Sequence, residues 1–406
     1  MTCKQRFSAL LLLAVPFVCA NCRGDVGAKQ IVRFDEPYDG SQELLNNKGA
    51  VLLRYVDRAD RMQVVAVHAD PVANQWVMSS RLVDFPYWPP RAEPVVDDIL
   101  VTTNTSGTLA SRITDGSVVW VKPEPIRLLA RDENWIICTV RTGRRDEAPF
   151  ELAGIEALTG RVVWQRDLAR PGLDPLTVGV EAAMDKANDY VAMLTSSGDQ
   201  LSVRKLSDGT PVATRELGGH RSDHVLGAHG LLICFGDDQI GAFRSSTLEM
   251  AWAANIVTSD NSEDMTRFGN LHSWGARVVN ENLYVVETGS KSVMCIDVAT
   301  GKTRWRQPFS GALDGSMFAV SKRYVVVGRF ISKLSQADYA PPGMEFRSLE
   351  MELTWLDMAD GSVDQVWRTK EGVYSTIGRM LATDDECVYI ITRSGVQAIG
   401  WPPEGR

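Results

Sequence analysis

The sequence predicts an all-β protein, a single β-propeller of eight blades, with seven blades as the alternative. Tryptophan recurs at a regular interval, since Trp76, Trp120, Trp164 and Trp252 are separated by 44, 44 and 88 residues. Short apolar segments rich in β-branched and aromatic residues alternate with polar turns along the chain. A repeat of about 40 to 50 residues with four strands is typical of a propeller blade. One ring therefore accounts for most of the 406 residues, where length alone suggests two or three domains.

The best-preserved repeats carry a glycine turn followed, four residues later, by a tryptophan on the next strand. We expect the glycine to adopt a positive φ in a tight hairpin, and the Asp or Thr before it to bond the turn backbone. We expect the tryptophan to lie flat between neighbouring blades and to bury about 200 Å² or more. In one repeat, Ala213 stands where the tryptophan would be. The predicted turn glycines are Gly116, Gly160, Gly209, Gly301 and Gly361, and the predicted inter-blade tryptophans are Trp76, Trp120, Trp164, Trp252, Trp305 and Trp367.

Eight blade cores follow from this repeat, and the propeller is expected to span residues 29–401. The eighth core is short, and the apolar segment from Lys29 to Glu36 is predicted to complete it, because a propeller avoids a long unpaired edge. The innermost strand of the first blade is not placed by the pattern. The predicted cores lie near residues 48–82, 91–122, 126–167, 177–217, 220–256, 272–308, 315–369 and 372–400.

The N-terminus is predicted to be a secretory signal peptide over residues 1–20. Lys4 and Arg6 precede an apolar stretch that is too short to span a bilayer, and small residues stand at the expected cleavage site. Export to the periplasm or cell envelope is the expectation. Cys22 is a candidate for lipid attachment, although Cys19 and Asn21 match a lipobox poorly. Residues 21–28 and 402–406 are expected to be short tails.

Composition excludes several classes of function. A net charge of −8 argues against nucleic-acid binding, whose footprint would be basic. An apolar content of 44% with 11 Trp argues against disorder, and no apolar run has the length of a membrane span. The cysteines in predicted strands, Cys138, Cys234, Cys295 and Cys387, are expected to be small buried hydrophobes rather than a disulfide framework.

The run CIDVATGKTRW, from Cys295 to Trp305, resembles the repeat of PQQ-like, quinoprotein-type propellers (A-x-D-x-x-T-G-x-x-x-W). The run from Ile155 to Trp164 is a second copy, and the resemblance extends over nearly all of the mature chain. It implies one of two functions. Large family members are dehydrogenases that hold pyrroloquinoline quinone and calcium in the central funnel. Smaller, BamB-like members bind proteins and carry no cofactor.

We expect a non-catalytic scaffold that binds protein partners without a cofactor or metal, with outer-membrane protein assembly as the specific role. The adjacent half-cystines and elaborated loops that are common in the family's dehydrogenases do not occur in this sequence. A calcium- and quinone-dependent dehydrogenase is the first alternative. The second is a propeller that binds a small molecule or polysaccharide in its central channel. We expect the propeller to be monomeric.

Long insertions are the candidate partner loops, because loops carry function more often than the strands they join. One extends from Thr258 to Ser273 and another from Phe330 to Arg347. The candidate contact residues are Trp88, in an aromatic and proline-rich loop after the first blade, and Tyr339, Met344 and Phe346 in the second insertion.

Two polar clusters are expected to be structural. The pairs Asp97-Asp98 and Asp384-Asp385 precede apolar strands and are interpreted as turn residues rather than acid/base pairs. His220, His224 and His229 lie on a predicted loop that leads into blade five, where their spacing gives no shared face for a metal.

Overall fold

The computed structural model describes backbone between residues 28 and 401. The candidate partner residues Trp88, Tyr339, Met344 and Phe346, together with Cys22 and residues 1–20, lie outside the described residues. The gaps are residues 34–42, 48–49, 57–60, 68–74, 82–91, 97–98, 105–106, 116, 142–149, 168–180, 196–197, 219–221, 237–238, 257–274, 288, 312, 314–316, 322, 332–348, 374–380, 385–386 and 393–394.

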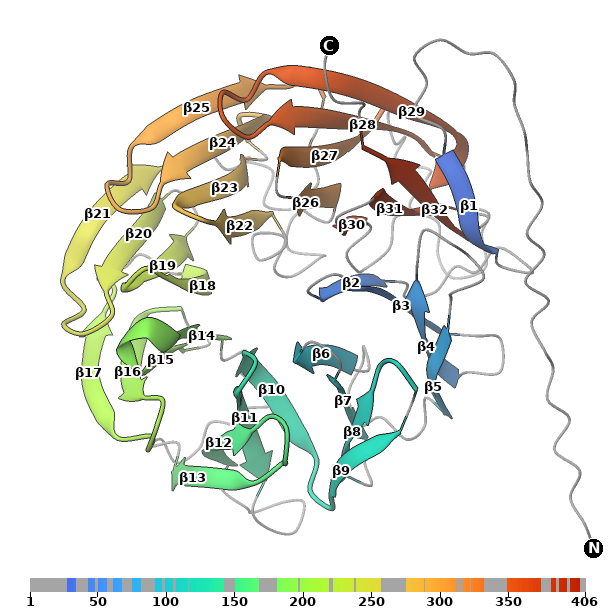
Figure 1. Ribbon diagram of the computed structural model, residues 1–406. Coiled ribbons are helices and arrows are strands. Elements are labelled where there is room, and N and C mark those ends of the chain that lie inside the picture. The colour runs from blue at the N-terminus through green and yellow to red at the C-terminus, as the bar shows by residue number, and fades with distance from the viewer. Residues whose placement is uncertain are drawn as a thin grey trace, which may run out of the picture.

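The described residues form eight four-stranded antiparallel sheets, arranged as the blades of a ring (Figure 1). This confirms the predicted β-propeller. In blades one to seven the strands follow one another in chain order from the channel to the outer rim. Neighbouring strands are joined as simple antiparallel hairpins, which explains why the repeat is visible along the sequence.

The first four blades contain strands β2 to β17. Blade one is β2 (Glu43–Asn47), β3 (Ala50–Val56), β4 (Arg61–Val67) and β5 (Gln75–Arg81). Blade two is β6 (Ala92–Val96), β7 (Ile99–Asn104), β8 (Gly107–Arg112) and β9 (Val118–Lys122). Blade three is β10 (Ile126–Arg131), β11 (Trp135–Arg141), β12 (Phe150–Glu156) and β13 (Val162–Asp167). Blade four is β14 (Glu181–Asp185), β15 (Tyr190–Leu194), β16 (Gln200–Lys205) and β17 (Pro211–Glu216), with the 3₁₀ turn η3 (Lys186–Asn188) after β14.

The remaining blades complete the ring. Blade five is β18 (Ser222–Ala228), β19 (Leu231–Gly236), β20 (Gln239–Arg244) and β21 (Met250–Asn255). Blade six is β22 (Ala276–Val279), β23 (Asn282–Glu287), β24 (Ser292–Asp297) and β25 (Thr303–Pro308). Blade seven is β26 (Phe318–Val320), β27 (Tyr324–Phe330), β28 (Leu349–Asp357) and β29 (Val363–Val373). Blade eight is β30 (Leu381–Thr383), β31 (Cys387–Thr392), β32 (Gly395–Gly400) and β1 (Ala28–Arg33).

The ring is closed by its N-terminal strand, as predicted. Strand β1 pairs antiparallel with β32, from Ala28 opposite Ile399 to Arg33 opposite Gly395. It supplies the outermost strand of blade eight, because the C-terminal end of the chain provides only three strands there. Blade one begins at Glu43, five residues before the predicted core, with the strand that the sequence pattern did not place.

The middle strands of each blade are buried on both faces, which is why they are continuous apolar runs in the sequence. All six residues of β19 are buried, whereas the outer strand β13 buries only Trp164. The core clusters span neighbouring blades: one joins Ile99 and Val101 of blade two to Ile136 and Cys138 of blade three. Packing between blades therefore forms the core of the ring.

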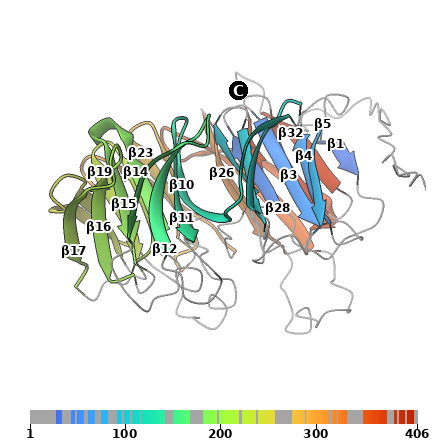
Figure 2. The same cartoon turned by 90° about the horizontal axis from the view of Figure 1, so that it is seen from below.

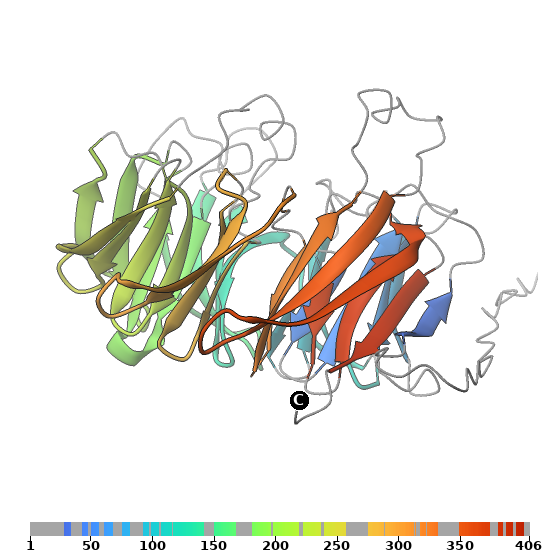
Figure 3. The same cartoon turned by 90° about the horizontal axis from the view of Figure 1, so that it is seen from above.

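The ring has two faces with different connections, which Figures 2 and 3 show edge-on. In a four-stranded antiparallel blade, the links from strand one to two and from three to four leave from one face, here named the turn face. The links from strand two to three, and from one blade to the next, leave from the opposite face, named the connection face. Residues 82–91, 257–274 and 332–348 all join strand ends on the connection face.

Candidate functional site

Four described tryptophans bridge neighbouring blades. Each is at most 8% exposed and lies on the outer strand of its blade. Each indole N–H donates to a backbone carbonyl of the next blade, three residues before that blade's turn glycine or its equivalent. These bonds run from Trp120 to Ala157 (2.9 Å), from Trp164 to Leu206 (2.6 Å), from Trp252 to Val298 (2.8 Å) and from Trp305 to Met358 (3.0 Å).

The turn glycines pack directly on these indoles. A Cβ atom built at Gly209 would lie 2.5 Å from Trp164, and one at Gly301 would lie 2.6 Å from Trp252. Both glycines have positive φ, of 72° and 71°. Each glycine therefore serves the tryptophan of the preceding blade, in addition to shaping its own hairpin. Sequence reasoning found the conformational requirement and missed this contact, because the two partners are more than 40 residues apart.

The other predicted positions are described less fully. Trp76 lies on β5 with its backbone paired to Val65, and its side chain is outside the described residues, as is all of Gly116. Trp367 is partly buried and packs against the apolar cluster between blades seven and eight.

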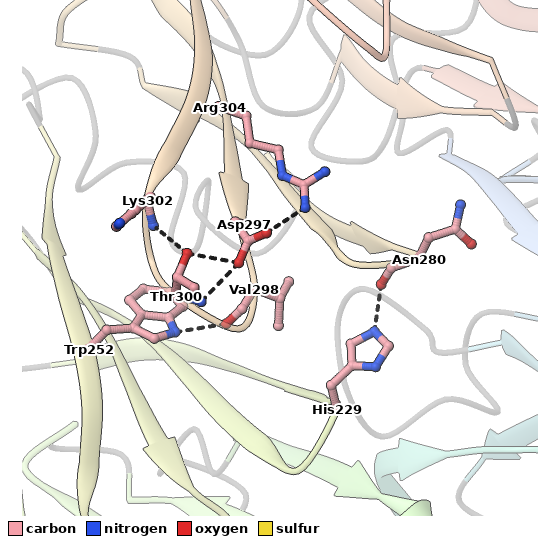
Figure 4. A network of polar contacts seen from close by, with 8 residues as sticks. All are labelled: His229, Trp252, Asn280, Asp297, Val298, Thr300, Lys302 and Arg304. Atoms are coloured by element: carbon pink, nitrogen blue, oxygen red, sulfur yellow. Dashed lines mark hydrogen bonds and ion pairs between the residues drawn. The ribbon is translucent and has the colours of Figure 1, made fainter.

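The residue before each turn glycine caps its hairpin. The Asp208 carboxylate accepts the Thr210 backbone N–H at 2.9 Å, and Asp360 accepts that of Ser362 at 2.8 Å. The side-chain hydroxyls of Thr210 and Ser362, together with these backbone N–H groups, lower the pKa of the two carboxyls. Figure 4 shows the blade-six turn, in which Asp297 binds Arg304 and Thr300.

The junction between blades four and five is built differently from its neighbours. Ala213 replaces the tryptophan, and Leu248 occupies the glycine position of the next blade with a φ of 58°. Leu248 is 2% exposed and packs in one cluster with Ala213. The Arg215 guanidinium donates to the Leu248 carbonyl at 2.8 Å and lies 5.2 Å from the centre of the Phe243 ring. The larger leucine thus compensates for the smaller alanine.

The same junction is closely joined at the channel. A Cβ at Gly227 on β18 would lie 2.2 Å from the Met184 carbonyl oxygen on β14, so the two inner strands touch through their backbones. The Ser245 hydroxyl donates to the Asp185 carboxylate at 2.6 Å, and both side chains are buried. His224 Nδ1 lies 3.1 Å from the Glu181 carboxylate.

The predicted histidine loop is a strand, which corrects the sequence interpretation. Residues 222–228 form β18, because Val225 and its neighbours pair with β19 from Ser222 to Ala228. His229 sits in the following turn and contacts the Asn280 carbonyl at 2.6 Å, while His220 is outside the described residues. Within the described ranges, no group of three or more His, Cys, Asp or Glu side chains is placed to hold a metal ion.

Two buried carboxylates lie towards the connection face and are neutralised by arginine. Glu352 on β28 is held by Arg329 and Arg368, with nitrogen–oxygen distances of 2.5 and 2.7 Å. Glu287 on β23 accepts hydrogen bonds from Ser292 at 2.5 Å and Arg306 at 3.1 Å. A calcium–quinone site would need several oxygen ligands that converge on one cation. Glu352 and Glu287 do not supply such ligands, because each is already paired with arginine within its own blade.

The sequence predicts that the aspartate pairs are turn residues and that the cysteines in strands are buried. The Asp384 carboxylate accepts the Cys387 backbone N–H at 2.7 Å, which is the contact of a turn residue, while Asp97, Asp98 and Asp385 are outside the described residues. Cys138, Cys234 and Cys295 are free and buried, and Cys387 is partly buried. Burial raises the pKa of the Cys138 and Cys234 thiols to about 12, so they stay protonated and unreactive.

These features define the class of protein as a PQQ-like β-propeller. The chain belongs to the family described as outer membrane protein assembly factor BamB, whose sequence model matches residues 61–227 and 236–396. A search of the curated proteins found no match. No helix among the described residues is long and apolar enough to cross a membrane.

Solved structures of low sequence identity share the fold. BamB from Moraxella catarrhalis is 14% identical with a TM-score of 0.51, and the alignment covers 92% of this chain and 99% of that one. Saccharomyces cerevisiae Sqt1 is 10% identical with a TM-score of 0.56, over 94% and 100% of the two chains. A europium-containing methanol dehydrogenase is 12% identical with a TM-score of 0.50, over 91% and 85%. At these identities the likeness concerns the fold alone, and it includes both a BamB and an enzyme.

Proposed function

We propose that this chain is an exported, non-catalytic propeller that binds protein partners through its connection face. One observation carries the proposal: residues 82–91, 257–274 and 332–348, which contain the aromatic and proline-rich loop and nearly all of the two insertions predicted from the sequence, all join strand ends on that face. Segments far apart in the chain are thereby anchored around one side of the ring. A ring whose strand ends on one face are joined by long, aromatic-containing segments suits a protein-binding surface.

Blade seven supports this role through its longer outer strands. Strands β28 and β29 have 9 and 11 residues, against 6 in each of the corresponding strands of blade six. The added length lies at the connection-face end, where Leu349 pairs with Val373. The buried Glu352, clamped by arginines from both flanking strands, fixes the base of this extension. The insertion with Tyr339, Met344 and Phe346 is therefore anchored on a braced hairpin.

The specific role proposed is participation in outer-membrane protein assembly, which the family's description supports. The expected location is the periplasmic side of the cell envelope, reached through the signal peptide at residues 1–20. Lipid attachment at Cys22 would tether the ring to a membrane. Membrane fractionation of the wild-type chain and a Cys22→Ala variant tests the tether. If Cys22 carries a lipid, the wild type should stay with the membranes until detergent is added, whereas the variant should be released without detergent.

Affinity capture from envelope extracts tests the proposed function. The wild-type chain should retain barrel-assembly components, and a triple variant Tyr339→Ala, Met344→Ala, Phe346→Ala should retain much less. The matched control is a triple variant on the turn face, Arg161→Ala, Lys302→Ala, Arg304→Ala, which should capture as the wild type does. Loss of capture in the control alone, or no stable partner for the wild type, would contradict the proposal.

The dehydrogenase alternative has its own direct test. The purified chain is supplied with calcium and pyrroloquinoline quinone, and dye-linked alcohol oxidation is followed. The proposal expects no turnover above the protein-free control, and sustained turnover would overturn the non-catalytic assignment.

A further inference from the structure

Exposed apolar side chains gather at the outer rim of the junction between blades two and three. Five of the ten large apolar side chains that are exposed among the described residues lie there. Val118 and Val121, on the outer strand of blade two, are 60% and 66% exposed, and Leu158, Val162 and Val163 of blade three are also exposed. We name these five residues the valine patch. An apolar cluster on a folded surface marks an interaction site, whereas scattered exposed valines do not.

Trp120 joins the two halves of the valine patch. Its indole donates to the carbonyl of Ala157, the residue before Leu158, at 2.9 Å. A Cβ atom built at Gly160, two residues before Val162, would lie 2.7 Å from the same indole. The inter-blade contact therefore fixes the apolar side chains of the two blades relative to one another. The patch begins at the turn face, because Leu158 and Val162 border the turn between β12 and β13.

Strand β9 is also an edge strand. It is the outermost strand of blade two, so its outer side has no neighbour in the sheet (Figure 1). Charged side chains on an edge strand discourage pairing with another chain. The residue that follows the inter-blade tryptophan is Arg306 in blade six and Arg368 in blade seven, but it is Val121 in blade two. The edge of β9 is thus apolar where other outer strands of the ring are charged.

The exposed valines of β9 are complementary to themselves. Val118 pairs with Ser111 and Val121 with Leu109 on β8, and the register shifts between these two pairs. Because Ser111 and Leu109 are two residues apart, Val118 and Val121 lie on the same face of the sheet. If two copies of β9 pair antiparallel about Trp120, Val118 of each copy lies opposite Val121 of the other.

The charges at the ends of β9 fit the same arrangement. Lys122 is the last residue of the strand, and Asp115 lies in the turn before it, where its carboxylate accepts the Ser117 N–H at 2.8 Å. In the antiparallel pair, Lys122 of one copy lies opposite Ser117 of the other. Asp115 is then its diagonal neighbour, within reach of a long side chain. Opposite charges therefore meet at both ends of the apolar contact.

We propose that the valine patch is the contact surface of a two-fold symmetric dimer, in which the β9 strands of two copies pair antiparallel. A second copy is selected as the occupant because the strand carries both halves of the match, valine for valine and Lys122 for Asp115. The inference goes beyond the proposed function and replaces the monomer expected from the sequence. The connection face stays free for partners, because the patch begins at the opposite face.

Sedimentation velocity of the purified chain, over about 1 to 100 µM, tests the dimer. The wild type should show a monomer–dimer equilibrium. Val118→Asp should weaken the dimer about tenfold or more, because each interface would bury two carboxylates against valine. The matched control is Val363→Asp, since Val363 is 47% exposed on the outer strand of blade seven, and it should associate as the wild type does. A thermal melt of each variant verifies folding.

An exchange of charges tests the antiparallel arrangement. Asp115→Lys places two lysines at each end of the contact, and Lys122→Asp places two aspartates there, so each variant alone should dimerise about tenfold or more weakly. An equimolar mixture of the two variants restores a Lys–Asp pair at both ends and should form the mixed dimer. A variant that had merely lost its fold would not be rescued by mixing.

Three outcomes would overturn the inference: a wild type that stays monomeric at about 100 µM, undiminished dimerisation of a folded Val118→Asp, or no association in the mixture of charge variants. If the wild type is monomeric and Val118→Asp loses an envelope partner that Val363→Asp retains, the patch serves another protein and the dimer is likewise excluded. The dimer and the proposed function fail separately, because a monomeric chain can still capture barrel-assembly components through its connection face. A photoreactive residue at Arg161, beside the patch, should link two copies, and the doubled chain mass separates this product from crosslinks to other partners.

Discussion

Two neighbouring junctions of the ring solve the same packing problem with different residues. Between blades three and four, Trp164 bonds the Leu206 carbonyl and lies on Gly209. Between blades four and five, Ala213 faces a bulky Leu248. The volume lost on one blade is restored on the next, so the repeat conserves packing between blades rather than any one residue. The tryptophan and the next blade's glycine form one unit.

The largest loss of stability is expected from removing Trp164 at the junction between blades three and four. Trp164→Ala should lower the free energy of unfolding by about 3 to 5 kcal/mol, because it opens a cavity and leaves the Leu206 carbonyl without its donor. Denaturant unfolding measures it, with the exposed Val212→Ala as control. An unchanged midpoint would show that this contact does not hold the junction.

Converting the Trp164–Gly209 pair into the alanine–leucine pair of the next junction should show that the two positions are energetically coupled. Gly209→Leu alone should be destabilising, because the side chain would collide with Trp164. The double variant Trp164→Ala, Gly209→Leu reproduces the alanine–leucine pair and should be more stable than the two single effects predict, by about 1 to 3 kcal/mol. Strict additivity in the double-mutant cycle would refute the idea that the pair acts as a unit.

The alanine–leucine junction should depend more on its polar links near the channel. Asp185→Ala leaves the buried Ser245 hydroxyl without its acceptor and should cost about 1 to 3 kcal/mol. Asp199→Ala, a change at an exposed turn, is the comparison. If the two variants unfold at the same denaturant concentration, the buried link contributes nothing.

The smallest effect concerns the turn-face carboxylates. Hydrogen bonds from Arg304 and Thr300 lower the pKa of Asp297 from 3.8 to about 2. A carboxyl whose pKa is lower in the folded than in the unfolded protein stabilises the fold at every pH above the unfolded-state pKa. This contribution is lost as the pH falls towards and through the folded-state pKa. The melting temperature of the wild type should therefore exceed that of Asp297→Asn at neutral pH, and the gap should close between about pH 4 and pH 2. A gap independent of pH would assign the effect to something other than this ionisation.

Much of the ring could be predicted from the sequence, because its strongest signals are local. The predicted limits of blade three, residues 126–167, coincide with the start of β10 and the end of β13. The inner strands were harder to place: β26 and β30 have only three residues each and carry little periodicity. The β18 strand was missed because its glycine and the histidines in and beside it are typical of a loop, although Gly227 allows the close approach of the Met184 backbone.

Contacts between blades could not be predicted from local pattern. The substitution of Leu248 for glycine is meaningful only beside Ala213, which lies 35 residues earlier. The arginine clamp on Glu352 likewise combines three strands. The candidate partner residues were chosen by composition, and topology adds that their segments join strand ends on a single face.

Site-specific photo-crosslinking in the intact cell envelope tests the central claim most directly. A photoreactive residue is placed at Tyr339 or Phe346 for the connection face, and at Lys302 or Arg161 for the turn face. The account predicts discrete crosslinks to barrel-assembly components from the first pair and none from the second. Crosslinks of equal yield from both faces, or from the turn face alone, would contradict it.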